Sequence, residues 1–579
     1  MPASTRSTLS QARPFGWACL FLSLSLAAGQ AWPDAFGGST PTDATSQDPA
    51  GLDVASGINS QALVGGSTAS GAGSGATGLS STATGFNSQA SAAGSTADGA
   101  NSVASGWAST AAGLGSSATW ISSTAVGAFS NAAGPMATVY GVSSTAGGGS
   151  TALGFKSVAN GGSTALGNGA DAAVFDSTAV GANAVVSGID ATGIGGDSQA
   201  VGSGSVAAGS YTQATGAFSV AVGSTSHATS SNTTAVGYGA QALGGNGTAI
   251  GYGSGAGGTN SVALGASSQA TGTWAIAAGV GGRATADATT SLGGLGQATG
   301  VESSSFGFNS AATAASGTAV GANSAAAGVQ SLAVGAGSSA SGQQSLASGA
   351  GSQASGAGVV ADGALSQATA NGASAVGAGS KAGAVFAVAL GNGANAAGAD
   401  SLALGSNSSA AAAAGNSVAL GYGASVSATN GVALGSGSSA SAANSVALGQ
   451  GSAATRANSV SVGDSATGLA RQITNVAPGT ARSDAATVGQ LDDAIQGQSQ
   501  QSQSYARGIG ALSSAATSAA VTAAGLPGHS KVALGVGSCG DQAAMGLAYA
   551  QTFGSWGATI NGAYSGTSTQ VGAGAGFSW

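Results

Sequence analysis

Short alternating groups of apolar residues repeat along most of the chain at a fixed spacing. The group SVALG begins at Ser261, Ser417 and Ser445, and each copy ends on a glycine. Taken as a marker, this glycine occurs at thirty positions from Gly57 to Gly463, nearly always fourteen residues apart. A disordered chain has no reason to keep such a register. The spacing therefore predicts an ordered repeat structure over residues 53–463.

One repeat predicts one coil of a stacked β structure. Val262 and Leu264 are two residues apart and share one face of a short strand, whereas Ala263 lies on the other face. A second strand of small residues is expected near Ala270, so that two strands of about five residues and two turns complete the coil. Parallel stacking at roughly 4.8 Å per layer gives a rod on the order of 140 Å long.

The repeat has three irregular steps and a thin core. Two steps of thirteen residues end at Gly154 and Gly167, and one step of sixteen follows Gly405. A coil of such small residues buries little by itself, so we expect several chains to meet along an apolar stripe. The residues predicted to form this shared core of the head are Val262, Leu264, Val418, Leu420, Val446 and Leu448.

After Gly463 the apolar spacing changes to that of a helix. Residues 464–490 bring back charged and β-branched side chains, which marks a boundary. An alternating three-and-four spacing then predicts a short coiled coil over residues 491–512, and no strong helix breaker follows until Gly525 and Pro527. The residues that carry this spacing are Val488, Leu491, Ile495, Tyr505, Ile509 and Leu512.

From Lys531 onward the apolar period becomes two, which predicts four strands of about nine to eleven residues. The opposite parity is mostly Gly, Ala, Ser, Thr and Asn, and this pattern is typical of an outer-membrane barrel. We assign residues 513–579 to such an anchor, formed by a helix and the four strands. Its predicted lipid-facing residues are Val532, Leu534, Val536, Met545, Leu547, Tyr549, Phe553, Trp556, Ile560, Tyr564, Val571, Phe577 and Trp579.

Four strands cannot close a barrel, and an open edge is not tolerated in lipid. Several chains must therefore contribute strands to one barrel. Two chains would give eight strands and three would give twelve, and only the larger barrel leaves obvious room for helices inside. The sequence favours three chains without proving that number. A soluble four-stranded sheet is the competing interpretation.

Composition and charge exclude several classes of protein. Gly accounts for 106 of 579 residues, and aromatic and charged residues for 5% each, so a thick core of large side chains cannot form. The net charge is −8 with no basic cluster, which argues against nucleic acid as a partner. The N-terminus has the pattern of a secretory signal peptide over residues 1–31, followed by a linker over 32–52. Its removal would leave Cys539 as the lone cysteine.

The sequence contains no recognisable catalytic, cofactor-binding or metal-binding constellation. His227 is expected in a repeat turn and His529 at the entry to the anchor, with no carboxylate pair, nucleophile motif or metal-ligand spacing beside either. Calcium-binding nonapeptide repeats would need an Asp in each GGxGxD turn, and those turns are absent from the sequence. Ice-binding solenoids would need ranks of Thr on one flat face, whereas Thr is scattered along this sequence. We expect a chain that is not an enzyme.

These motifs resemble the trimeric autotransporter adhesins of Gram-negative bacteria, with a head like that of the YadA-type members. The SVALG-type repeats are similar to the left-handed parallel β-roll of that head, and residues 526–579 are similar to its anchor. The most specific match is the neck, within residues 471–491 (RQITNVAPGTARSDAATVGQL). The neck residues are Arg471, Gln472, Ile473, Thr474, Asn475 and Val476.

The resemblance implies a homotrimer whose twelve-stranded outer-membrane barrel is threaded by three helices. It also implies assembly by the barrel-assembly machinery, display of the head at the cell surface, and adhesion to host or abiotic surfaces through a matrix or surface ligand. Two functions stay open at this point. One is an adhesin that binds through many weak sites along its rod, and the other is a fibre that binds copies of itself and clumps cells.

Overall fold

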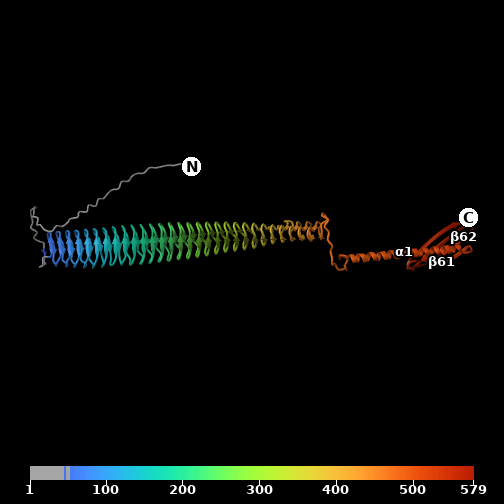
Figure 1. Ribbon diagram of the computed structural model, residues 1–579, viewed down its shortest axis with the longest axis horizontal. Helices are drawn as coiled ribbons and strands as arrows, with labels where there is room; N and C mark the ends of the chain where they lie inside the picture. The colour runs from blue at the N-terminus through green and yellow to red at the C-terminus, as the bar shows by residue number, and fades with distance from the viewer. Residues whose placement is uncertain (1–44, 47–51, 567, 579) are drawn as a thin grey trace, which may run out of the picture. The chain divides into compact units, whose positions relative to one another are not determined.

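The structure is a computed structural model that describes residues 45–46, 52–566 and 568–578 (Figure 1). The chain divides into two compact units, the first ending at Leu469 and the second beginning at Ala470. The predicted signal peptide and most of the predicted linker lie outside the described residues. Each unit is described separately below.

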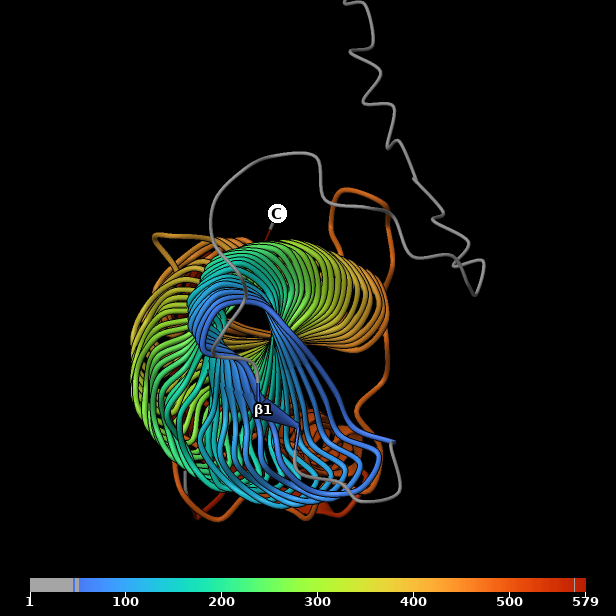
Figure 2. The same cartoon turned by 90° about the vertical axis from the view of Figure 1, so that its left-hand side faces the viewer.

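The first unit is a β-solenoid built from two parallel sheets of thirty short strands each. The odd-numbered strands, from β1 (Thr45–Ser46) to β59 (Ala453–Ala454), form one sheet, here called the odd sheet. The even-numbered strands, from β2 (Val54–Ser56) to β60 (Val460–Ser461), form the even sheet. Each coil adds one strand to each sheet. Seen end-on, successive coils are rotated progressively about the axis of the stack (Figure 2).

The pairing register confirms the predicted repeat, including its irregular steps. In the even sheet, Val262 of β32 (Val262–Leu264) pairs with Ile276, fourteen residues later. The offset falls to thirteen where β14 (Thr138–Tyr140) pairs with β16 (Thr151–Leu153). It rises to sixteen where β52 (Leu402–Leu404) pairs with β54 (Val418–Leu420). Each layer therefore keeps its neighbours in register even where one coil is shorter or longer.

The strands are shorter than the five residues we predicted. Strands of the even sheet have three residues, as in β32, except for the last one, β60, and those of the odd sheet have two, as in β33 (Gln269–Ala270). The turns at both ends of each strand take up the difference. Every coil turns twice, and residues with positive φ recur every seven residues, as at Asn232, Gly239 and Asn246.

Small side chains fill the interior of every coil. In the coil that begins at Ser261, the inward residues are Ser261, Ala263, Ser268 and Ala270, all with no exposed surface. Among the described residues, the largest fully buried side chains are four valines, at positions 139, 186, 359 and 426. Since Ala and Ser bury little apolar surface, each coil depends on the coils above and below it for stability.

The second unit opens with residues 470–487, which form no helix or strand. Helix α1 (Val488–Gly525) follows and begins with a capping box, in which the side chains of Thr487 and Gln490 each accept a backbone N–H of the other residue. The helix continues through Gly508 and Gly510 without a break. The segments predicted as stalk and as anchor helix therefore belong to one element.

Four antiparallel strands complete the second unit, as predicted. They are β61 (Ser530–Cys539), β62 (Gln542–Phe553), β63 (Trp556–Tyr564) and β64 (Thr569–Phe577), and they pair in chain order. Helix α1 packs on one face of this sheet, mostly against β61 and β62. The close approach requires glycine: a Cβ at Gly537 would lie 2.5 Å from the carbonyl oxygen of Ala511, well inside van der Waals contact.

Candidate functional site

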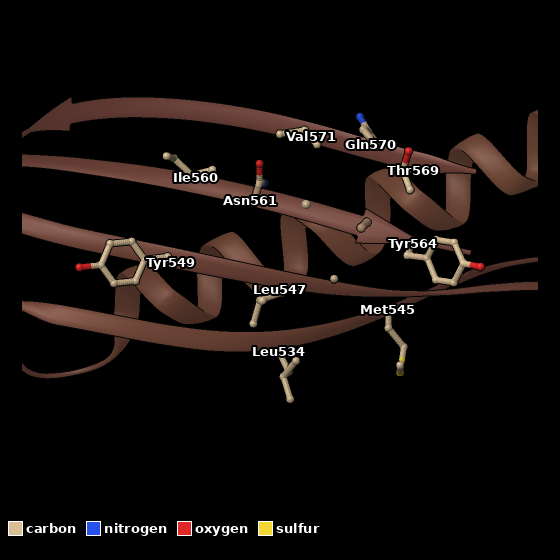
Figure 3. A pocket seen from close by; sticks show the side chains of 13 residues that line it. Leu534, Met545, Leu547, Tyr549, Ile560, Asn561, Tyr564, Thr569, Gln570 and Val571 are labelled. Carbon is tan, nitrogen blue, oxygen red and sulfur yellow. The ribbon is translucent and has the colours of Figure 1, made fainter. Parts of the chain in front are cut away.

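The outer face of the four-stranded sheet carries almost all the residues predicted to face lipid. Their side chains alternate with small buried ones, so that Leu534 is 75% exposed and Ala533 only 5%. Trp579 lies outside the described residues. The exposed set comprises Val532, Leu534, Val536, Met545, Leu547, Tyr549, Phe553, Trp556, Ile560, Tyr564, Val571 and Phe577. Leu534, Met545 and Tyr549 project from this face beside a shallow apolar hollow (Figure 3).

The inner face of the same sheet packs against helix α1 through small side chains. Ala544 and Ala563 are buried with Ala511 and Ala515, and a second cluster joins Ala519 to Ala548. Two hydrogen bonds also join the helix to the sheet: the side-chain amide of Asn561 donates to the carbonyl oxygen of Ala516 at 3.0 Å, and the Lys531 ammonium donates to that of Ala524 at 3.1 Å. The small residues, which the sequence predicted on the face opposite the apolar one, are thus the residues that face helix α1.

Both edges of this sheet lack a strand partner within the described residues. β61 pairs only with β62, and β64 pairs only with β63. Each edge therefore presents a row of backbone N–H and C=O groups that can pair with another strand. Cys539, at the end of β61, is exposed in the single chain.

The predicted neck residues lie in the irregular segment that precedes helix α1. Ile473 is 71% exposed and Asn475 has a left-handed backbone with φ of 61°. Further along, the Asp484 carboxylate accepts the backbone N–H groups of Thr480 and Ala481 at 2.9 and 2.8 Å. These two bonds hold the pKa of Asp484 below its usual range. Gln490 exchanges two hydrogen bonds with the backbone of Gly479 and fastens the segment to the first turn of the helix.

The two outward faces of the solenoid differ in polarity. Along the odd sheet, the outward residue of each strand is commonly Gln, as at Gln241, Gln269 and Gln297. Along the even sheet, the predicted stripe residues lie on the outward face, with Leu264 38% exposed and Ala263 buried behind it. Val262, Val418, Leu420, Val446 and Leu448 take the same outward positions. The core within one chain therefore consists of Ala and Ser. The outward Val and Leu residues remain exposed and are available for contact with another chain.

The structure corrects our statement that Thr is scattered. Ten consecutive strands of the even sheet begin with Thr, which places these side chains in one rank on its outward face. The third residue of the same strands varies between Ser, Asp, Ala, Val, Tyr, Leu and Ile as well as Thr, so the rank is single. Its members are Thr68, Thr82, Thr96, Thr110, Thr124, Thr138, Thr151, Thr164, Thr178 and Thr192.

Ionisable groups are few and dispersed along the solenoid. Among the described residues, no three His, Cys, Asp or Glu side chains gather closely enough to hold a metal ion. His227 lies in strand β27 (His227–Ala228), not in a turn as we expected. Burial raises the pKa of Asp171 in β19 (Asp171–Ala172). Asp98 accepts a hydrogen bond from Thr84 of the adjacent layer at 2.6 Å.

The sequence analysis missed a set of residues at the turns. Positions with left-handed backbone mostly carry Gly or Asn, the residue types that tolerate it best. Several large apolar or aromatic residues occupy the same positions and are exposed, namely Phe129, Met136, Tyr211, Phe218, Trp274, Leu295, Leu365 and Phe386. An alignment of the sequence with a period of seven residues would have shown these large residues at the turn positions.

Within the described residues, no helix is both long enough and apolar enough to cross a membrane. The molecule is a β-solenoid repeat protein, with a helix that ends on a sheet whose far face is apolar and exposed.

The family models assign both regions. The model of the YadA head domain repeat (2 copies) matches thirteen stretches between residues 76 and 466, some of which overlap. The model of the coiled stalk of trimeric autotransporter adhesin matches residues 472–514. Together they match more than half of the chain. The chain belongs to the YadA-like trimeric autotransporter adhesins.

One solved structure that resembles the chain is the collagen-binding domain of the Yersinia adhesin YadA. The two share 28% sequence identity, and the match covers 35% of this chain and 87% of that domain, with a TM-score of 0.21. No curated protein matches the chain.

Proposed function

We propose that the chain is a surface adhesin anchored in the outer membrane of a Gram-negative bacterium as a homotrimer. The observation that carries this proposal is the C-terminal sheet, whose outer face is mostly apolar and whose two edges are unpaired within the described residues. A bilayer accepts an apolar face but not open strand edges. Edge-to-edge pairing of three such sheets satisfies every backbone group in a barrel of twelve strands, with the three α1 helices inside.

The solenoid supports association between chains from its own surface. The outward face of the even sheet is apolar from Val206 onward for most coils, whereas the odd sheet is polar. We propose that the even sheets of three chains face one another and bury Val262, Leu264 and their counterparts. The odd sheets and the turns then face the medium, where attachment to a host matrix or an abiotic surface would occur.

Delivery of the head follows from the same anchor. We infer that a signal peptide directs the chain to the periplasm, that the barrel-assembly machinery inserts the C-terminal strands, and that the head passes through the barrel they form. Small inward residues such as Gly535, Gly537 and Gly546 leave room for helices in that lumen.

The anchor is tested by electrophoresis of outer-membrane fractions without heating. The full chain should run as a heat-resistant species of trimer size, and truncation after Leu526 should abolish it. Val571→Lys on the outer face should destabilise insertion by about 2–4 kcal/mol, while Gln570→Lys on the opposite parity should leave the trimer intact. A monomer in the periplasm for both the full and truncated chains would refute the proposal.

Adhesion is tested by binding of whole cells to immobilised matrix proteins and to plastic. Deleting residues 57–405 with the anchor retained should reduce binding, and undiminished binding would exclude the head as the adhesive part. The alternative, a fibre that binds copies of itself, predicts that cells lacking the protein are left out of clumps formed by cells that carry it. A mixed culture with two fluorescent labels measures this directly.

A further inference from the structure

One turn edge of the solenoid carries an unusual row of five residues in consecutive coils. The row runs Phe218, Asn232, Asn246, Asn260 and Trp274, and all five have left-handed backbone with φ between 55° and 63°. We call it the aromatic–amide strip. It places an exposed aromatic side chain at each end of three stacked carboxamides, with the two rings four coils or roughly 19 Å apart.

The three asparagines form a ladder of hydrogen bonds. The amide nitrogen of Asn232 donates to the side-chain oxygen of Asn246 at 3.2 Å, and that of Asn246 donates to Asn260 at 2.9 Å. A carboxamide has two N–H groups and an oxygen with two lone pairs. The middle amide, Asn246, therefore still has one donor and one acceptor for an external group. The ladder also fixes the side-chain rotamers before any ligand arrives.

The aromatic ends are placed at a conformational cost. A left-handed backbone disfavours residues other than Gly, Asn and Asp, yet Phe218 and Trp274 occupy it and remain 67% and 66% exposed. Burial within the chain does not repay that cost, because two thirds of each side chain contacts no other residue. Strain held at an exposed position is typical of a functional contact.

The surroundings of the strip select the chemistry of its ligand. Between Asp197 and Arg283 the sequence contains no Asp, Glu, Lys or Arg. The charged group beside the strip is Asp287, whose carboxylate accepts the backbone N–H of Thr273 at 2.8 Å and disfavours an anionic polymer. The residues beside the strip, among them Ala217, Gly245 and Thr259, are too small to form the contiguous apolar centre of a protein interface. Hydroxyl groups both donate and accept, as carboxamides do, and the C–H face of a sugar ring stacks on an aromatic ring.

We propose that the aromatic–amide strip binds a neutral polysaccharide that lies along the axis of the rod. The sugars at either end stack on Phe218 and Trp274, and the hydroxyls between them bond to the asparagine ladder. The layer spacing is close to the length of one pyranose unit, so successive sugars meet successive coils. This proposal rests on the adhesive role proposed above and gives it a class of ligand.

The test uses the purified full chain in detergent micelles with fluorescent cellohexaose, maltohexaose and chitohexaose as probes. At least one of these neutral hexasaccharides should bind, and Phe218→Asn, Trp274→Asn and Asn246→Gly should each weaken its binding at least tenfold. The first two variants introduce the residue that neighbouring coils already carry at that turn, so the fold is retained. The matched controls are Phe386→Asn, a strained aromatic elsewhere, and Asn444→Gly, in a ladder without aromatic ends.

Three outcomes would overturn the proposal. The first is that no neutral hexasaccharide binds, and the second is that the strip variants and the controls behave alike. The third is that a charged hyaluronan hexasaccharide or a protein binds through the strip while the neutral sugars do not. Because the assay needs neither a membrane nor a cell surface, its failure leaves the anchor unaffected. Loss of the outer-membrane trimer, conversely, would not alter sugar binding in micelles.

Discussion

Replacing one marker glycine should open the solenoid locally, and Gly265 is the best position for the experiment. Its φ is +120°, a value that residues with a side chain rarely adopt, and an added Cβ would lie 2.8 Å from both the carbonyl carbon and the oxygen of Gly279 in the next layer. Both are backbone atoms that cannot rotate away. Backbone strain of about 1–3 kcal/mol and overpacking of about 1–3 kcal/mol together predict that Gly265→Ala destabilises this coil by roughly 2–6 kcal/mol.

The assay is hydrogen exchange at the amides that join the affected layers. Gly265 donates to the carbonyl oxygen of Ile250 and Gly279 to that of Leu264, both at 2.8 Å, so their exchange reports opening of these coils. A loss of 4 kcal/mol would raise the local opening equilibrium by roughly a thousandfold. Distant coils should be unaffected, because each coil contacts only its neighbours.

Gly253→Ala is the matched control. Its φ is +60°, within the region that Asn and Asp occupy elsewhere in this chain, and only the Ser267 hydroxyl lies near the added Cβ, at 4.0 Å. We expect a loss of about 1–2 kcal/mol from the backbone alone. Equal exchange in the two variants would refute the argument that interlayer contact, and not only backbone conformation, requires glycine at the markers.

Three further predictions follow from contacts in the two units. Ser268→Ala should destabilise its coil by about 1 kcal/mol, because the Ser268 hydroxyl donates to the carbonyl oxygen of Gly265 at 2.8 Å. Ser261→Ala should not destabilise the coil, since the buried Ser261 hydroxyl has no hydrogen-bond partner among the described residues. Hydrogen exchange of residues 261–274 compares the two variants. Gly537→Val should abolish the heat-resistant oligomer, because the added side chain would push β61 away from helix α1. Gly554→Asn should preserve the oligomer, because Gly554 lies at a left-handed turn with open space around it. A stable Gly537→Val oligomer would contradict the close packing of β61 on helix α1. Because the pKa of Asp484 is lowered in the folded chain, its turn is fully stabilised above the usual carboxyl pKa and loses that stabilisation as the pH falls through the lower folded pKa. The NMR shifts of the Thr480 and Ala481 amides should follow this loss. Asp484→Asn should remove the pH dependence of both shifts.

The repeat architecture was predictable because its signal is a spacing and not a residue type. The marker glycines gave the thirty layers, and the steps of thirteen and sixteen residues appear in the strand pairing at the expected places. The sheet facing helix α1 was predictable for a similar reason, since one parity is apolar and the other small. In both regions the backbone periodicity fixes which side chains share a face.

The features that escaped prediction depend on neighbours in space. Strand lengths were overestimated, because the residues that flank a three-residue strand belong to turns set by positive φ at positions such as Gly265. The Thr rank from Thr68 to Thr192 emerges only when coils are stacked. The role of Gly510 also depends on a neighbour, because helix α1 passes close to β61 there and a Cβ would lie 3.0 Å from the sulfur of Cys539.

The nearly uniform offset between paired strands has a consequence for how this gene can change. Each strand residue of a regular coil pairs with the residue fourteen positions away, so deleting or duplicating a whole fourteen-residue unit leaves the pairing of the remaining strands intact. Recombination between near-identical repeats would then lengthen or shorten the rod by one layer, about 4.8 Å, at a time. The length of the rod can thus change in evolution by whole layers, without disturbing the fold or the C-terminal unit.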